Sequence, residues 1–369
     1  MHLKKVSLIN FKNLEQAEIS FDKRINCIVG DNGTCKTNII DAIYYLSMCK
    51  SALSMSDSQC IMHGKDFFMA EGYYVNAADR SDVISCTYSR SSQKCVKRNG
   101  KAYTRLSEHM GVVPVVLVSP FDSALICDAA EERRRYLNLF ISQFDSRYLA
   151  ALIRYNAVLA ERNRLLKINS DESVLQIYDM QLAESAVVIN TIRREVCEEL
   201  CKVVSHYYEI VSGGHEKVGL EYRSELNVTS LDVLLRASRE RDVINGFTSC
   251  GVHRDDLLFT IDGYPLRKYG SQGQQKSFVV ALKLAQCRII AERCGEKPIL
   301  LLDDIFDRLD RKRVVSLVRA ATAEEFGQVF ITDCNKERME QVLGEVDVDY
   351  RMVEVSYGAI IGGDETDGV

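Results

Sequence analysis

The feature that most constrains this chain is a strand–loop–helix pattern in residues 24–46. A short apolar run ends at Gly30, and an apolar pattern of helical period begins after Lys36 and Thr37. Such periodicity predicts a buried strand followed by a helix. The connecting loop is rich in small residues. Because this layout presents backbone N–H groups and a helix N-terminus to an anion, the pattern indicates a phosphate-binding loop.

The loop follows the pattern G-x-x-x-x-G-K-[ST] with one exception. Gly30, Lys36 and Thr37 occupy their motif positions, whereas Cys35 stands where the motif has its second glycine. In this motif the lysine reaches the β- and γ-phosphates of a nucleotide, and the hydroxyl group binds Mg²⁺. The predicted nucleotide-binding residues of the loop are Gly30, Asp31, Asn32, Gly33, Thr34, Cys35, Lys36 and Thr37.

Composition narrows the class of protein further. The chain has 369 residues, of which 46% are hydrophobic and 27% charged, which is enough for two or three ordinary globular domains. The net charge of −5 provides no global basic field, so any DNA contact needs a local patch. The 13 cysteines, without a secretory signal pattern, lead us to expect free thiols in a reducing cytoplasm. No segment has the apolar length of a membrane span.

Changes of pattern along the chain predict four parts. Residues 1–114 carry the loop and the alternating apolar residues of antiparallel strands. Residues 115–240 are mainly amphipathic helix. Strands return in residues 241–361, together with a helix at residues 272–294. The acidic, glycine-rich residues 362–369 are expected to be disordered.

An Asn-Gly pair at residues 99 and 100 predicts a tight hairpin with a type I′ turn. Basic residues gather near its tip, at Lys94, Lys97, Arg98 and Lys101. A solvated tip is the simpler interpretation, and a DNA contact is the alternative. The same two interpretations apply to the arginine-rich helices, which begin with Arg133-Arg134-Arg135.

A second motif is an apolar strand, residues 299–302, that ends in Asp303 and Asp304. In P-loop ATPases a strand of this kind places one carboxylate at the carboxyl edge of the sheet, where it holds Mg²⁺. The next carboxylate is positioned to orient or deprotonate a water molecule. By itself the pattern also fits an ordinary strand that ends in a polar loop. Together with Lys36 and Thr37 it predicts a nucleotide site.

A third motif, residues 270–277, precedes the predicted helix. Ser271 is a plausible N-cap, and small residues at a helix N-terminus can approach a phosphate closely. A capped helix start explains the serine and one glycine, but it does not explain the repeated glutamine and glycine residues.

Two further segments carry polar residues. The segment Gly251–Asp256 suggests a structural or phosphate-sensing turn rather than a metal or acid–base site, because adjacent side chains do not converge. The segment Asp307–Asp310 follows the aspartate pair. In Thr332-Asp333, a polar residue at the end of an apolar strand is a candidate sensor of the γ-phosphate.

The order of these motifs resembles the ABC-type ATPase head that is shared with the SMC family. Within that group the chain is similar to the RecF family, over nearly its whole length. The segments at 251–256 and 271–275 are the most specific part of the likeness. The resemblance implies an α/β fold: an ABC-type P-loop ATPase head, with a mixed sheet, helices and an antiparallel subdomain. An inserted helical arm, residues 115–240, would replace a long coiled coil.

The resemblance also implies a role for each motif in a site for ATP and Mg²⁺. Thr37 and Asp303 would hold the metal, Asp304 would serve the attacking water, and Lys36 would bind the phosphates. A loop of one subunit would close over the nucleotide held by the other, through Ser271, Gln272 and Gly273. The implied catalytic residues are Asp304, Lys36 and Ser271.

The biological role implied by the resemblance is recombinational repair. ATP would form a homodimer, and DNA, either single-stranded or gapped duplex, would lie across it. Slow, DNA-stimulated ATP hydrolysis would open the dimer and release the DNA. The family acts with other Rec recombination-mediator proteins in gap repair, replication restart and SOS induction.

The chain departs from the family pattern at four positions. Phe121 and Asn138 stand where the family has acidic residues, Val252 replaces a proline, and Cys35 replaces the loop glycine. A non-glycine residue in such a loop costs about 1–3 kcal/mol of strain, which would weaken ATP binding. A helix N-terminus lowers a thiol pKa, so Cys35 is also a candidate for oxidation.

Three other functions are alternatives. A pseudo-ATPase repair scaffold would keep the fold and lose the nucleotide cycle through Cys35. The helical arm and the segment 251–256 argue against a transporter-associated ATPase subunit. A fused nuclease would need a further acidic metal cluster, which the sequence lacks.

Overall fold

The computed structural model describes residues 1–76, 78–168, 170–214, 216–306, 309–323, 325–356 and the backbone of residues 359–362. These residues form two compact units. The first unit contains residues 1–122, 210–213 and 280–369, and the second contains residues 123–209 and 214–279. These bounds differ from the predicted arm of residues 115–240, because residues 241–279 group with the helices of that arm. The predicted disorder of the tail falls, for residues 363–369, outside the described part of the chain.

A six-stranded sheet forms the centre of the first unit. Its strand order is β15-β14-β3-β13-β12-β8, and all neighbours are parallel except β15, which runs antiparallel to β14. The strands are β3 (Ile25–Val29), β8 (Val115–Val118), β12 (Ile299–Leu302), β13 (Val329–Asp333), β14 (Arg351–Ser356) and β15 (Ala359–Gly362). Every residue of β3, β12 and β13 is buried, as continuous apolar runs in a covered parallel sheet require.

A second six-stranded sheet of this unit is antiparallel, with the order β2-β1-β4-β5-β6-β7. Its strands are β1 (His2–Phe11), β2 (Leu14–Ser20), β4 (Phe67–Val75), β5 (Ser81–Ser89), β6 (Ser92–Arg98) and β7 (Lys101–Ala102). Asn99 and Gly100 have φ angles of 51° and 79°, which confirms the predicted type I′ turn. The helix α1 (Lys36–Met48) contacts strands of both sheets.

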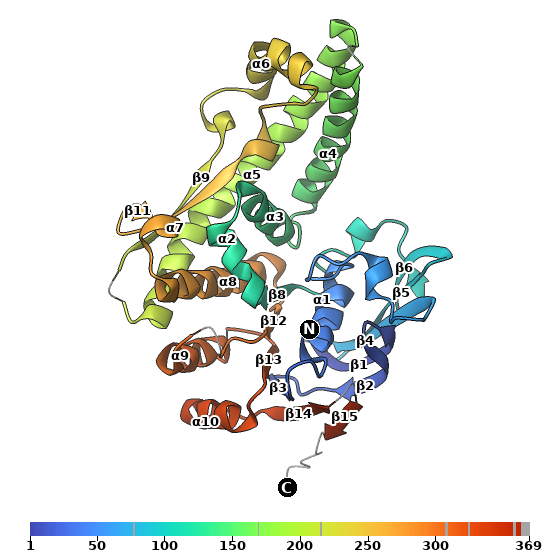
Figure 1. Cartoon of the computed structure of the whole chain (residues 1–369), viewed down its shortest axis with the longest axis vertical. Coiled ribbons are helices and arrows are strands. Elements are labelled where there is room, and N and C mark those ends of the chain that lie inside the picture. The colour runs from blue at the N-terminus through green and yellow to red at the C-terminus, as the bar shows by residue number, and fades with distance from the viewer. Residues whose placement is uncertain are drawn as a thin grey trace. The chain divides into compact units, whose positions relative to one another are not determined.

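Helices cover the central sheet of the first unit. The helices α9 (Arg311–Ala321) and α10 (Lys336–Val346) pack against each other and lie beside β12, β13 and β14 (Figure 1). The helix α8 (Gln272–Cys294) starts at the residue predicted from the sequence and crosses the boundary between the two units. Short 3-10 turns occur at Asp57–Cys60, Leu106–Glu108, Pro120–Ser123, Glu225–Asn227 and Val252–Arg254.

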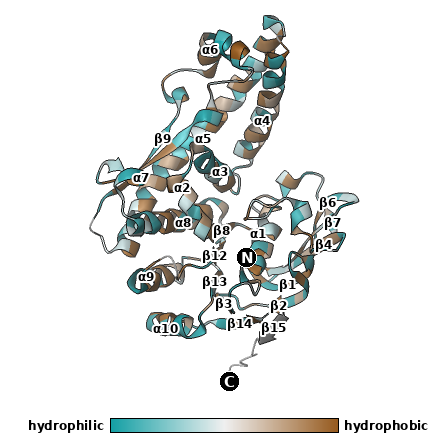
Figure 2. Cartoon of the chain, in the orientation of Figure 1, coloured by the Kyte–Doolittle hydropathy of each residue, from teal (hydrophilic) through white to brown (hydrophobic). Residues whose placement is uncertain are grey.

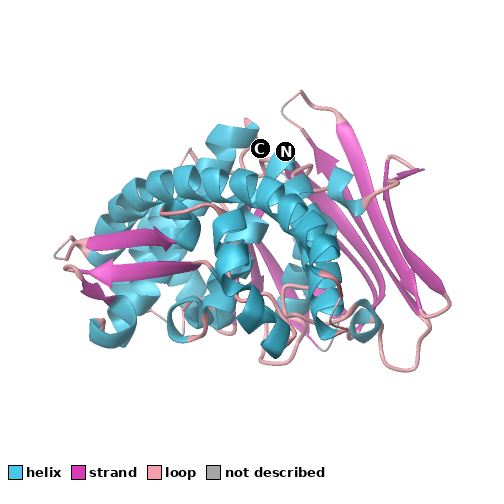
Figure 3. Cartoon of the chain, turned by 90° about the horizontal axis from the view of Figure 1, so that it is seen from above, coloured by secondary structure: helices cyan, strands magenta, loops and turns pink. Residues whose placement is uncertain are grey.

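The second unit is mostly helical, as the sequence predicts. Its helices are α2 (Ala124–Cys127), α3 (Ala130–Ile141), α4 (Ser146–Lys167), α5 (Glu172–Ser212), α6 (Leu231–Asn245) and α7 (Leu266–Tyr269). A small antiparallel sheet contains β9 (Val218–Arg223), β10 (Asp256–Ile261) and β11 (Tyr264–Pro265); strands are magenta in Figure 3. Both α4 and α5 carry hydrophilic and hydrophobic residues along their length (Figure 2). None of the described helices is long and apolar enough to cross a membrane.

A buried charge network joins the helices α4, α5 and α6. Arg162 has no exposed side-chain surface, and its guanidinium group lies 2.6 Å from a carboxylate oxygen of Asp179 and 3.0 Å from one of Asp242. It also donates a hydrogen bond to Thr248 at 2.8 Å. Charges removed from water are tolerated only when they are paired. The network therefore holds three helices of this unit in register.

Replacing Arg162 with methionine removes the central charge and leaves the buried carboxylate of Asp242 without a charged partner, while Asp179 keeps its ion pair with Arg239. We expect the free energy of unfolding to fall by about 3–5 kcal/mol. The matched control is Arg154→Met, which breaks an exposed pair with Glu184 (side chains 53% and 61% exposed) and should cost less than about 1 kcal/mol. Urea denaturation followed by circular dichroism measures both. Equal losses in the two variants would show that the network is not stabilising.

Candidate nucleotide site

The loop between β3 and α1 is wrapped around the ammonium group of Lys36. This group donates hydrogen bonds to the backbone carbonyls of Gly30 at 2.7 Å and Asp31 at 2.9 Å. The Thr34 hydroxyl donates to the Asp31 carbonyl at 2.7 Å. The tip of the loop is exposed and contains Asp31, Asn32 and Gly33, which the sequence predicts to bind the nucleotide. The loop therefore concentrates a lysine charge and a helix N-terminus at one place, which favours an anion.

Gly30 is required by a close approach of the backbone. A Cβ atom there would lie 2.1 Å from the carbonyl oxygen of Val355 and 2.8 Å from the hydroxyl oxygen of Thr34. No side chain fits in that space, so the first glycine of the motif has a packing reason in addition to its motif position.

Cys35 has a backbone conformation that favours glycine. Its φ of 86° and ψ of 7° lie in the left-handed region, at the N-cap of α1. For a side-chain-bearing residue this conformation costs about 1–3 kcal/mol. The loop keeps the glycine-type path, and the cost of the substitution is strain at this residue. The predicted strain is thus confirmed.

The expected lowering of the Cys35 thiol pKa by the helix N-terminus is wrong. Its side chain is only 7% exposed, and burial raises the pKa of the thiol, while a hydrogen bond with Asn13 opposes this rise. Thiolates, rather than thiols, are oxidised readily. Burial therefore outweighs the effect of the helix N-terminus. Asn13 lies in the turn between β1 and β2, and its contact with Cys35 was not expected from the sequence.

Thr37 and Asp303 lie together, as the two motifs predict. The Thr37 hydroxyl donates to a carboxylate oxygen of Asp303 at 3.3 Å, and the Thr332 hydroxyl donates to the same oxygen at 2.8 Å. Asp303 is 4% exposed, and burial raises the pKa of its carboxyl group. One hydroxyl and one carboxylate oxygen at the mouth of the loop form a donor set that suits Mg²⁺. These residues therefore fit the metal that the motifs imply.

Thr332 has a role that sequence reasoning missed. Besides its bond to Asp303, its hydroxyl accepts a hydrogen bond from the backbone N–H of Asp304 at 3.0 Å. Asp304 has a left-handed φ of 49°. Thr332 therefore orients both aspartates, and the γ-phosphate sensor expected in Thr332-Asp333 stays a prediction. Its neighbour Asp333 is held by an ion pair with Arg338.

The segment before α8 forms a capping box. The Ser271 hydroxyl accepts from the Gln274 N–H at 3.3 Å, and the Gln274 side chain accepts from the Ser271 N–H at 2.7 Å. The Gln275 side chain donates to the carbonyl of Gly270 at 3.0 Å. Gln274 and Gln275, which a capped helix start alone did not explain, thus have structural roles. Ser271 and Gln272 are exposed and Gly273 is half-buried. All three belong to the second unit.

The turn Gly251–Asp256 makes structural contacts, which agrees with one of the two interpretations that the sequence favours, a structural or a phosphate-sensing turn. The Tyr155 hydroxyl lies 2.8 Å from one ring nitrogen of His253, and Arg193 binds Asp255 at 2.6 Å. Burial lowers the pKa of His253 to about 4, so the ring is neutral near pH 7. No group of three potential metal ligands occurs among the described residues. In the segment after the aspartate pair, Asp307 and Arg308 lie outside the residues that the structure describes. Asp310 caps α9 by accepting a hydrogen bond from the backbone N–H of Arg313.

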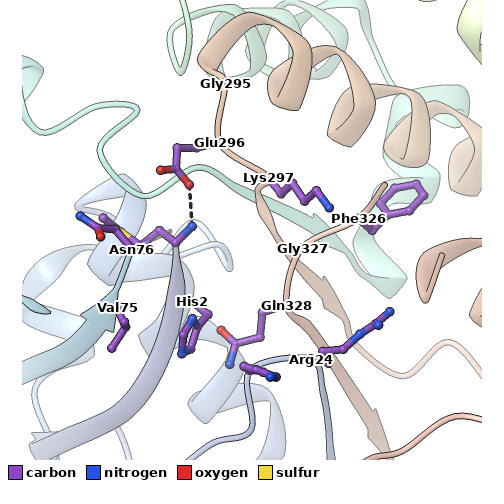
Figure 4. A pocket seen from close by; sticks show the side chains of 12 residues that line it. His2, Arg24, Val75, Asn76, Gly295, Glu296, Lys297, Phe326, Gly327 and Gln328 are labelled. Carbon is purple, nitrogen blue, oxygen red and sulfur yellow. Dashed lines mark hydrogen bonds and ion pairs between the residues drawn. The ribbon is translucent and has the colours of Figure 1, made fainter. Parts of the chain in front are cut away.

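A separate open cavity of about 580 Å³ lies in the first unit (Figure 4). Its lining includes Arg24, Lys297 and Gln328. Arg24 directly precedes β3 and Gln328 directly precedes β13, while Lys297 lies shortly before the start of β12. The phosphate loop follows the other end of β3. The cavity is therefore at the amino edge of the parallel sheet and is not the nucleotide site.

Comparison with known proteins places these motifs in a family context. The family described as "RecF/RecN/SMC N terminal domain" matches residues 2–357. The "DNA replication and repair protein RecF" of Bacteroides thetaiotaomicron is 44% identical over 362 residues, which are 98% of each chain. The protein of the same description from Flavobacterium johnsoniae is 43% identical over 357 residues, covering 95% of this chain and 99% of the relative.

Solved structures agree with this likeness. The structure of the recombination mediator protein RecF with ATP in the RecFOR pathway has a TM-score of 0.87 and 31% identity, and covers 98% of this chain and 97% of its own. An Smc head bound to the C-winged helix domain of ScpA has a TM-score of 0.58 at 17% identity, covering 100% of this chain and 98% of its own. The fold is thus the ABC-type ATPase head of the RecF and SMC proteins, as predicted.

The raised pKa of the Cys35 thiol and its burial predict slow alkylation. We expect iodoacetamide to label the exposed Cys127 at least about tenfold faster than Cys35 in the folded chain. Raising the pH should increase labelling of Cys35, since more thiolate forms. Mass spectrometry of the peptides measures both rates. In urea the two rates should become equal, and equal rates in the folded chain would contradict the burial argument.

Proposed function

The chain belongs to the RecF family of DNA replication and repair proteins, and on that premise we propose that it is an ATP- and DNA-binding recombination mediator. The observation that carries the proposal is the contact of Thr37 with Asp303, which joins the phosphate loop to the carboxylate strand. The structural likeness to RecF with bound ATP supports it.

We assign the nucleotide site to the loop Gly30–Thr37. Lys36 is already inside the loop, and exchanging its two carbonyl partners for phosphate oxygens would strengthen its hydrogen bonds. Thr37 and Asp303 are the residues that would hold Mg²⁺, which when bound neutralises developing charge on the phosphates. The short chain of bonds from Thr332 keeps the Asp303 carboxylate aimed at Thr37.

Asp304 is our candidate for orienting the attacking water. Asp304 directly follows Asp303, which would hold the metal. The backbone N–H of Asp304 donates a hydrogen bond to the Thr332 hydroxyl group, which fixes the backbone there. Ser271, Gln272 and Gly273 would complete the site from a second copy of the chain. The exposure of Ser271 and Gln272 and their place at the N-terminus of the 23-residue helix α8 support a contact with phosphate.

The dimer would bind single-stranded or gapped DNA, hydrolyse ATP slowly when DNA is bound, and then open. This cycle suits gap repair, replication restart and SOS induction together with other Rec recombination-mediator proteins. All 13 cysteines lie in the described part of the chain and none forms a disulfide bond, which supports a reducing cytoplasm as its compartment.

The alternative proposal is a repair scaffold whose nucleotide cycle is impaired. The left-handed conformation of Cys35 favours it, since the strain can be released by rearranging the loop away from its phosphate-binding path. The hydrogen bonds from Lys36 to the carbonyls of Gly30 and Asp31 favour a site that binds ATP, because they hold the lysine inside the loop. The two proposals differ in ATP affinity, which can be measured directly.

Replacing Cys35 with glycine removes the left-handed strain. If strain weakens the loop, Cys35→Gly should bind ATP about 5- to 150-fold more tightly, whereas Cys35→Ala keeps the strain and should match the native chain. Isothermal titration with ATP and Mg²⁺ measures this, and Lys36→Ala is the control without binding. If the native chain does not bind and glycine restores binding, the scaffold proposal is correct for the natural protein.

ATP-dependent dimerisation tests the shared site. With ATP and Mg²⁺ the native chain should form dimers in analytical ultracentrifugation, and Asp304→Asn should accumulate them because hydrolysis is blocked. Ser271→Asp and Ser271→Asn both preserve an N-cap, but only aspartate places a negative charge against the phosphates. We expect Ser271→Asp to stay monomeric and Ser271→Asn to dimerise. Absence of any dimer in the native chain would disprove the shared site.

A further inference from the structure

Two tyrosines next to the capping box are exposed and face each other. Tyr264 is 58% exposed and Tyr269 is 64% exposed. Their ring centroids are 5.1 Å apart and the rings are inclined by 43°. Single exposed apolar residues are common on protein surfaces. A pair of largely exposed aromatic rings at one place is less usual and offers free ring faces to a planar ligand.

The pair is mounted on a firmly anchored segment. Between the tyrosines, Leu266 is completely buried. The Gln275 side chain donates to the carbonyls of Leu266 at 3.3 Å and Gly270 at 3.0 Å. A Cβ atom at Gly270 would lie 2.6 Å from the Leu266 side chain, so the backbone is tightly packed there. The backbone segment that carries the rings therefore needs little ordering when a ligand binds.

Basic side chains accompany the rings. Arg267 and Lys268 lie between the two tyrosines in the sequence and are both exposed. The nearby negative charge of Asp262 is already engaged, because its carboxylate accepts a hydrogen bond from the backbone N–H of Lys217 at 2.9 Å. Aromatic faces attract bases, and cations attract phosphates. A ligand that carries both groups in alternation is a single-stranded nucleic acid.

We propose that Tyr264, Arg267, Lys268 and Tyr269 form a stacking platform for unpaired bases of single-stranded DNA. The inference rests on the proposed DNA-binding function and names one of its contact sites. Bases inside a duplex are stacked on each other and cannot reach the rings. The platform would therefore distinguish gapped or single-stranded DNA from fully paired DNA.

The test compares Tyr264→Ala/Tyr269→Ala with Tyr264→Phe/Tyr269→Phe in the full chain with ATP and Mg²⁺. Fluorescence anisotropy is measured with a single-stranded oligothymidylate, an abasic strand of equal length and a duplex. Alanine should weaken binding to the base-bearing strand by about 5- to 100-fold and leave the abasic strand and the duplex unchanged. Phenylalanine keeps the rings and should bind like the native chain. Tyr350→Ala, at a tyrosine that is 38% exposed, is the matched control.

The basic residues give an independent readout. Arg267→Ala/Lys268→Ala should weaken binding to the base-bearing and abasic strands alike and reduce the dependence on salt concentration, because these residues contact phosphates. Equal binding of native and double-alanine chains to oligothymidylate would overturn the platform and leave the proposed function intact. A native chain that binds no DNA at all would overturn the proposed function itself. Weaker ATP binding by the double-alanine chain would identify the rings as part of the nucleotide site instead and would overturn the proposal.

Discussion

The candidate site depends on one set of hydrogen bonds at the carboxyl edge of the parallel sheet. Thr37 lies in the first turn of α1, Asp303 directly follows β12, and Thr332 is the next-to-last residue of β13. One carboxylate oxygen of Asp303 accepts from both hydroxyl groups. Parallel strands end at the same edge, so residues that are hundreds of positions apart in the chain meet there. Burial makes these bonds strong and makes the loss of either partner costly. The phosphate loop and the aspartate pair are thus held as one unit.

Cys35 shows how much a fold can tolerate at a position selected for glycine. The continuous apolar core under the loop, β3 and α1, determines the backbone path, and the residue at the N-cap must follow it into the left-handed region. The strain of about 1–3 kcal/mol is small beside the packing of a buried strand and a buried helix face. The substitution therefore alters the energy of the loop and leaves its conformation in place, with the thiol buried against the turn that contains Asn13.

The segment before α8 illustrates that one residue can serve two purposes. Ser271 and Gln274 form a capping box, and Gln275 ties the preceding turn together. These bonds give Gln274 and Gln275 structural roles and leave Ser271 exposed at the helix N-terminus. The same packing presents Tyr264 and Tyr269 on a rigid base, so the rigidity that the helix start needs is also what a recognition surface needs.

The sequence by itself determined the local structure and the motif order. The phosphate loop, the Asn99-Gly100 turn, the start of α8 and the aspartates after β12 all follow from patterns that span a few neighbouring residues. Only the tertiary structure decided which distant groups meet: that Thr332 orients the aspartates, and that the Cys35 thiol is buried and less acidic. The physical reason is that turns and helix periods depend on short-range sterics, whereas burial, pKa and hydrogen-bond partners depend on residues that folding brings together.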